Sequence, residues 1–124
     1  MALKNVAVNG LTLSGVGISG GVVSIISVPS VDSKVDGNGI FFGNFQFSFS
    51  GGNFAGYDPG TVSTVGVAVI NPSAIFVKVD GSPVLLEGDN NPSVSMTGLV
   101  SGVPVPFVTS WSILSAGQTK VKAI

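Results

Sequence analysis

The chain has 124 residues, of which 9% are charged and 44% are hydrophobic, and its formal net charge is −1. The length fits a single domain, residues 1–124. The composition excludes a disordered chain, which combines low hydrophobicity with high net charge. An average soluble protein has about 25% charged residues. The shortage of charge therefore favours a chain that is buried against partners over a free monomer coated with neutral polar residues.

The residue types that are missing argue against an enzyme. Histidine and cysteine are absent, so the usual general base, the thiol nucleophile and the commonest metal ligands are lacking. Arginine is absent too, and the five lysines form no cluster of the kind that nucleic-acid binding needs: Lys4, Lys34, Lys78, Lys120 and Lys122. We therefore predict no catalytic, cofactor-binding or metal-binding residue, no cofactor and no nucleic-acid partner.

The sequence carries no signal for export or for membrane insertion. Its N-terminus lacks the unbroken apolar core of a signal peptide. The longest apolar stretch, residues 22–28, is interrupted by Ser24 and Ser27 and is far too short to cross a bilayer. These features predict synthesis in the cytoplasm without a signal peptide, and no stable insertion into a membrane.

Short runs of Val, Ile, Phe, Thr and Ser, separated by 18 glycines and 7 prolines, predict an all-β fold without a long helix. In the first half we expect strands at 3–8 and 22–28. Residues 45–49 alternate strictly between phenylalanine and polar residues, and Phe41 shares their parity. This pattern predicts a strand whose four phenylalanines face the core rather than a cofactor. Residues 50–53 are predicted to form a loop.

The second half contains the best-defined unit, a hairpin of residues 74–79 and 82–86 around the Asp80-Gly81 turn. Pro83 belongs at a strand start or an edge, and Pro104 and Pro106 leave one edge of their strand unable to pair fully. Residues 87–92 are predicted to be a polar turn. Further strands are expected at 61–70, 93–97, 103–113 and 119–123. The total of roughly eight to ten short strands predicts a sandwich, a barrel or a β-prism-like fold, without a repeat of fixed period.

Three local patterns offer chemistry, and each has a simpler explanation. Glu87 and Asp89 lie two apart, as a glycosidase pair could, but a solvated turn explains them better. Asp58 with Asp89 could bind calcium, yet no EF-hand spacing supports this. Residues 15–20 have the letters of a dinucleotide-binding loop, but a strand follows where that motif requires a helix. None of the three is predicted to be a functional site.

The hairpin resembles the repeat of PAAR-type spike-tip proteins. The matching residues are Ala74-Ile75-Phe76-Val77-Lys78-Val79-Asp80-Gly81-Ser82-Pro83-Val84-Leu85-Leu86-Glu87-Gly88-Asp89, and residues 115–121 are similar to a later return strand of such a protein. In that family the domain caps the trimeric spike of a contractile phage tail or type VI secretion system. A metal bound by histidine and cysteine often holds its tip together. This chain has neither residue type, so the resemblance implies a metal-free variant held by apolar packing.

The resemblance implies a structural protein that docks on a trimeric spike and is carried in a virion or an injection-system particle. A virion surface module is the alternative: a capsid-decoration, tail or fibre protein that self-associates as a homo-oligomer through an apolar sheet face. A carbohydrate-binding β-sandwich, with Trp111 and Tyr57 as stacking residues, ranks below both. The sequence thus predicts a protein partner and no enzymatic activity.

Overall fold

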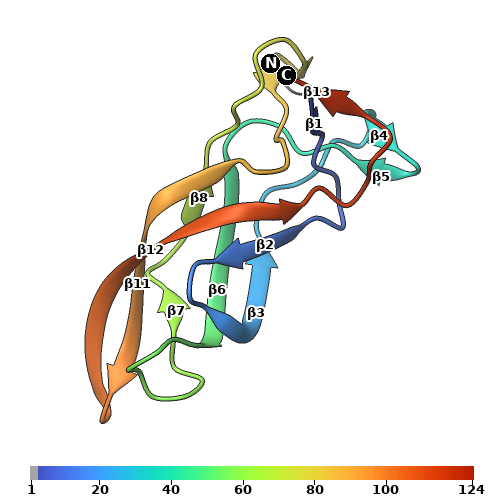
Figure 1. Cartoon of the computed structure of the whole chain (residues 1–124). Helices are drawn as coiled ribbons and strands as arrows, with labels where there is room; N and C mark the ends of the chain where they lie inside the picture. Colours follow the sequence, from blue (N-terminus) through green and yellow to red (C-terminus); the bar gives the residue numbers. More distant parts are fainter. Residues whose placement is uncertain (1–2) are drawn as a thin grey trace.

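The computed structural model describes residues 3–124 and confirms the all-β fold, with no helix in that range (Figure 1). The strands form five sheets, in the orders β1-β13, β10-β9, β2-β12-β11-β7, β3-β6-β8 and β4-β5. Their bounds are β1 Lys4–Asn5, β2 Thr12–Gly15, β3 Ser19–Ile25, β4 Lys34–Val35, β5 Asn38–Gly39, β6 Phe45–Asn53, β7 Ser63–Thr64, β8 Ala68–Ile70, β9 Lys78–Val79, β10 Ser82–Pro83, β11 Asn90–Val100, β12 Val103–Ser115 and β13 Lys122–Ala123.

One end of the molecule is a cap built from three short strand pairs, β1-β13, β4-β5 and β9-β10. The segments that follow these pairs, residues 6–8, 40–42 and 84–86, meet at its centre. There, the N–H of Ala7 donates to the carbonyl of Leu85 (2.8 Å), that of Leu85 to Phe41 (3.0 Å) and that of Phe41 to Ala7 (3.0 Å). This closed ring of hydrogen bonds gives the cap an approximate threefold symmetry.

Other contacts follow the same symmetry. Equivalent residues of the three segments form the isolated bridges Val6–Leu86, Val8–Ile40 and Phe42–Val84. A second set of backbone hydrogen bonds also repeats three times: Asn9 to Gly39 (2.9 Å), Gly43 to Pro83 (2.8 Å) and Glu87 to Asn5 (2.9 Å). The three segments are therefore structurally equivalent, not merely adjacent.

The prediction that the chain has no fixed repeat was wrong. Lys34, Lys78 and Lys122 each begin one of the equivalent strand pairs, at intervals of 44 residues. The next residue along is buried in all three cases: Val35, Val79 and Ala123. The third copy is assembled from β13 and β1, which lie at the two ends of the chain, so a search along the sequence sees only two of the three.

The rest of the chain forms a body in which the two larger sheets curl around the main hydrophobic core (Figure 1). Its longest feature is the antiparallel β11-β12 hairpin, whose turn at Ser101 and Gly102 lies at the end of the molecule opposite the cap. Below, the cap means residues 3–9, 30–43, 74–89 and 116–124, and the body means residues 10–29, 44–73 and 90–115.

The predicted burial of four phenylalanines is confirmed, although only three of them lie on β6 and Phe41 lies in the cap segment 40–42. Phe41, Phe45, Phe47 and Phe49 are all buried in the main core. Phe47 and Phe49 both pack on Trp111, with ring centroids 5.3 Å and 5.0 Å apart. Alternation along β6 therefore directs these rings inward, as the period of two requires.

Several predicted boundaries were wrong. Residues 50–53 continue β6 instead of forming a loop, because Gly51, with φ 73°, lets the strand remain paired to β3. The predicted turn at 87–92 is shortened, since β12 is long enough to pair with Asn90 and Asn91 before a bulge that contains Pro92. Residues 74–77 are not a strand, and Gly66 (φ 68°) divides the 61–70 run into β7 and β8.

The strand pair β4-β5 and the strand β2 were not predicted. Residues 3–124 contain thirteen strands, which exceeds the expected eight to ten. Both omissions have a local cause. Each arm of β4-β5 has only two residues, and β2 lies in a stretch that glycines interrupt. Such segments become strands through their partners, since β2 pairs with the end of β12, rather than through their own propensity.

Candidate interaction surfaces

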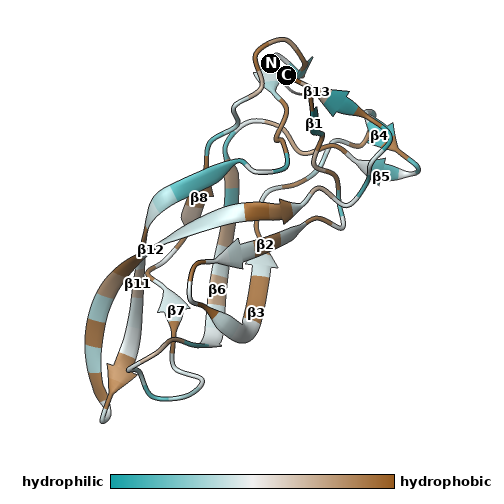
Figure 2. Cartoon of the chain, in the orientation of Figure 1, coloured by the Kyte–Doolittle hydropathy of each residue, from teal (hydrophilic) through white to brown (hydrophobic). Residues whose placement is uncertain are grey.

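Charge is distributed very unevenly between the two ends of the molecule. Within the body, Asp58 is the only charged residue, and all the other lysines and carboxylates belong to the cap. In Figure 2, which is coloured by hydropathy, the cap strands β1, β4, β5 and β13 are hydrophilic, as is the start of β11. The cap therefore presents a charged surface and the body a nearly uncharged one, and the two surfaces suit partners of different chemistry.

The body is also rich in exposed apolar side chains. Eleven large hydrophobic residues are exposed on it: Val16, Val22, Ile25, Ile26, Val28, Val65, Val67, Val100, Val103, Val108 and Leu114. The neutral polar residues between them provide hydrogen bonds but no net charge. A surface of this kind is typical of a contact surface rather than of one that is always in water.

The β11-β12 hairpin is built so that its free edge does not recruit further strands. Pro104 and Pro106 pair with Leu99 and Thr97 in an unbroken ladder, although proline has no N–H to donate. Both prolines must therefore occupy positions whose N–H would point away from β11. They remove two donors from the outer edge of β12, as the sequence predicted, and so disfavour edge-to-edge pairing.

Asp58 holds the turn of this hairpin in place. Its two carboxylate oxygens accept hydrogen bonds from the N–H of Ser101 (3.1 Å) and of Gly102 (2.9 Å). Its own N–H donates to the carbonyl of Leu99 (2.7 Å). The single charge of the body is thus occupied by backbone donors at the hairpin turn.

We expect the substitution Asp58→Ala to loosen the turn without unfolding the body. Two turn amides lose a charged acceptor, which lowers the free energy of local opening by about 1 kcal/mol, or about fivefold in amide exchange. Hydrogen exchange at Ser101 and Gly102 measures this effect. The exchange rate of the Asp58→Asn variant, which keeps one acceptor oxygen, should lie between those of the wild type and the alanine variant. Unchanged exchange in the alanine variant would contradict the assigned role.

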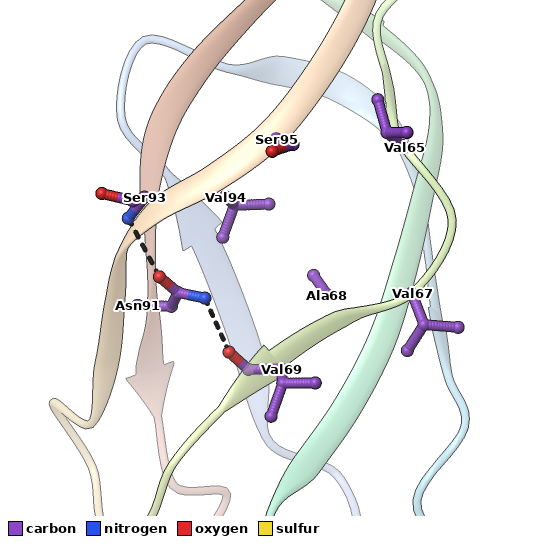
Figure 3. Close-up of a pocket in the computed structure, with 8 residues that line it drawn as sticks. All are labelled: Val65, Val67, Ala68, Val69, Asn91, Ser93, Val94 and Ser95. Atoms are coloured by element: carbon purple, nitrogen blue, oxygen red, sulfur yellow. Dashed lines mark hydrogen bonds between the residues drawn. The ribbon is translucent and has the colours of Figure 1, made fainter.

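Shallow grooves lie on the surface of the body. One of about 270 Å³ lies between β8 and β11, where the Asn91 amide donates to the carbonyl of Val69 (2.8 Å) and accepts from the N–H of Ser93 (2.9 Å) (Figure 3). Its remaining lining is valine, alanine and serine. A second groove of about 300 Å³ lies between β2 and β3, along Gly15, Ile18 and Val23. Neither groove is lined by a titratable side chain.

The carboxylates considered for catalysis or calcium binding have structural roles. Asp89 is 4% exposed, and it accepts hydrogen bonds from the N–H of Leu86 (2.9 Å), the N–H of Ser73 (3.2 Å) and the Ser73 hydroxyl. Glu87 accepts one from the N–H of Ala116 (3.0 Å). Asp89 therefore joins the cap to Ser73 of the body, whereas Glu87 joins two segments of the cap. Asp58 lies at the far hairpin turn, so the structure does not bring it together with Asp89.

The other residues singled out in the sequence are not arranged as a binding site. Trp111 is 2% exposed and its ring packs in the core, so it presents no face to a sugar. Tyr57 packs with Phe54 and Phe107. Residues 15–20 join β2 to β3 without a helix, which excludes the dinucleotide-binding geometry. Within residues 3–124, no group of three potential metal-ligating side chains occurs.

Comparisons with protein-family models, with curated proteins and with solved structures found no match for this chain. In the described part of the chain, no helix is long and apolar enough to cross a membrane. The case for a function therefore depends on the two surfaces themselves: a threefold cap that carries nearly all the charge, and an apolar body that ends in a long hairpin. Sequence reasoning missed the cap, although the recurring Lys-Val-Asp-Gly at 34–37 and 78–81 was a signal that could have revealed it.

Proposed function

We propose that this protein is a non-enzymatic structural protein that caps the end of a trimeric spike, as the tip of a contractile phage tail or injection system. The observation that carries the proposal is the closed ring of hydrogen bonds among Ala7, Phe41 and Leu85. A single chain with three equivalent segments can make the same contact with each subunit of a trimer, because their symmetry axes can coincide. One copy then suffices to cap one trimer.

The recurrence of the hairpin supports this proposal. The hairpin that resembles the spike-tip repeat occurs at β9-β10 and again at β4-β5, where the Asp-Gly turns have the same backbone: φ 50° and 80° at Asp80 and Gly81, and 51° and 82° at Asp36 and Gly37. The pair β13-β1 supplies a third copy without that turn. In the family that the 74–89 hairpin resembles, such a hairpin recurs.

The two ends of the molecule are suited to different tasks in such a tip. The cap exposes several large apolar residues, among them Leu3, Ile75, Phe76 and Val77, and Phe76 is 75% exposed. An exposed aromatic residue of this kind is a typical anchor of a protein interface. With the cap docked, the β11-β12 hairpin points away from the spike and meets the target first (Figure 1). The mechanism is mechanical: sheath contraction drives the docked tip forward, and hydrogen-bonded ladders carry the load.

The solution mass tests this proposal. We expect the isolated protein to be a monomer of 12.4 kDa by light scattering, and to form a complex of one chain per spike trimer when it is mixed with the spike protein encoded beside it. Equivalent contacts to three subunits leave no vacant site for a second chain. Three chains per trimer, or no complex, would contradict the proposal.

The apolar body favours a second candidate function, a virion surface protein that self-associates. Its eleven exposed hydrophobic residues and single charge would be buried in a homo-oligomer of a decoration, tail or fibre protein. The same measurement separates the two functions. A stable oligomer of the isolated chain, or binding only to capsids, favours the surface protein.

A further inference from the structure

Of the cap's charged residues, only lysines follow the threefold symmetry completely. Lys34, Lys78 and Lys122 occupy equivalent places at the start of β4, β9 and β13. Each is exposed, and each precedes a residue that packs inward, so the three side chains lie on the outer face of the strand pairs. No carboxylate occurs three times in this way, because the place of Asp36 and Asp80 is taken by Ile124 in the third copy.

None of the three lysines forms an ion pair with a carboxylate in the described part of the chain. Among residues 3–124 the one ion pair joins Lys120 to Asp36, at 2.9 Å, and it involves none of the three. Asp89 is buried, and Glu87 accepts hydrogen bonds from the N–H of Ala116 and the side-chain amide of Asn5. Asp32 and Asp80 remain exposed, but they do not match the three positive charges in number or in symmetry.

We infer that Lys34, Lys78 and Lys122 bind one carboxylate from each subunit of the trimeric partner. This inference depends on the proposed function, since a ring of three equivalent cations selects an equivalent ring of three anions only on a threefold-symmetric partner. The partner surface is therefore acidic, with an aspartate or glutamate of each subunit facing one of the three lysines. Charge complementarity of this kind speeds association and fixes the rotational register, while apolar contacts supply most of the affinity.

Charge reversal of the three lysines tests the inference against the spike trimer encoded beside this chain. Each single variant, Lys34→Glu, Lys78→Glu or Lys122→Glu, should weaken binding by a similar factor of about three to ten, and the triple variant by about a hundredfold. The wild-type affinity should also fall more steeply with salt than that of the triple variant. Lys4→Glu is the matched control, because Lys4 is an exposed cap lysine whose equivalents are Asn38 and Ser82; it should change the affinity less than twofold.

The outcomes separate this inference from the proposed function. If the triple variant binds the spike as tightly as the wild type, or if only one of the three lysines affects binding, the lysines do not bind a ring of carboxylates. The proposed capping function would be unaffected by either result. A wild-type chain that binds no trimer overturns both. If the triple variant unfolds, the three single variants test the inference: equal losses of affinity support the ring of lysines, and unequal losses contradict it.

Discussion

Replacement of Phe47 by alanine should lower the free energy of unfolding by about 4 kcal/mol. Phe47 is 0% exposed at the centre of the aromatic row, between Phe45 (6.2 Å between ring centroids) and Trp111 (5.3 Å). The substitution leaves a cavity that β6 cannot close, because its backbone is hydrogen-bonded to β3 on one side and to β8 on the other. Urea denaturation with a two-state fit measures the loss.

Phe76→Ala is the matched control, since it removes the same side chain from a position that is 75% exposed. Its free energy of unfolding should change by less than about 0.5 kcal/mol. If Phe76 anchors the cap on the spike, the same variant should weaken spike binding by about thirtyfold. Equal destabilisation by both variants would contradict the assigned core, whereas a stable Phe76 variant with unchanged binding would contradict only the anchor.

The body strands could be predicted from the sequence where the pattern was local and long. Strict alternation from Phe45 to Phe49 identified both the strand and its buried face, because a period of two admits no other arrangement. The Asp80-Gly81 turn was recognised for a similar reason, since two apolar runs flank it. The same letters at Asp36-Gly37 were overlooked because Gly39 and two-residue arms give almost no strand signal.

The recurring Lys-Val-Asp-Gly could have revealed two copies of the cap unit, but the threefold arrangement could not be predicted, because it is formed by segments far apart in the sequence. The ring that joins Ala7, Phe41 and Leu85 needs strand pairing between the two ends of the chain, and no local propensity encodes that contact. The uneven distribution of charge was visible in the sequence as long uncharged stretches. The sequence did not reveal that the charged segments lie together at one end of the molecule, because only the fold brings them there.

Gly39→Ala should lower the free energy of unfolding by about 3 kcal/mol, a large effect for one added methyl group. A Cβ at Gly39 would lie 2.2 Å from the carbonyl oxygen of Ser30, which is a backbone atom. The Ser30 segment has little freedom to retreat: its N–H donates to the carbonyl of Ile40 (2.8 Å), and its hydroxyl accepts from the N–H of Ser33 (3.0 Å). The overlap must therefore be relieved by displacing β5, whose Gly39 carbonyl also accepts one of the three symmetric cap hydrogen bonds, from Asn9.

Gly37→Ala, in the turn of the same hairpin, separates steric overlap from loss of backbone freedom. A Cβ at Gly37 meets no atom within 4 Å, but its φ of +82° is unfavourable for alanine and should cost about 1 kcal/mol. The melting temperature of Gly39→Ala should therefore be well below that of Gly37→Ala. The reverse order would contradict the close contact between Gly39 and the Ser30 carbonyl. The equivalents of Gly39 in the other two copies are Pro83 and Asn5, which carry side chains. The requirement for glycine thus comes from the Ser30 segment and not from the threefold arrangement, so the cap keeps its symmetric hydrogen bonds while each copy packs against different neighbours.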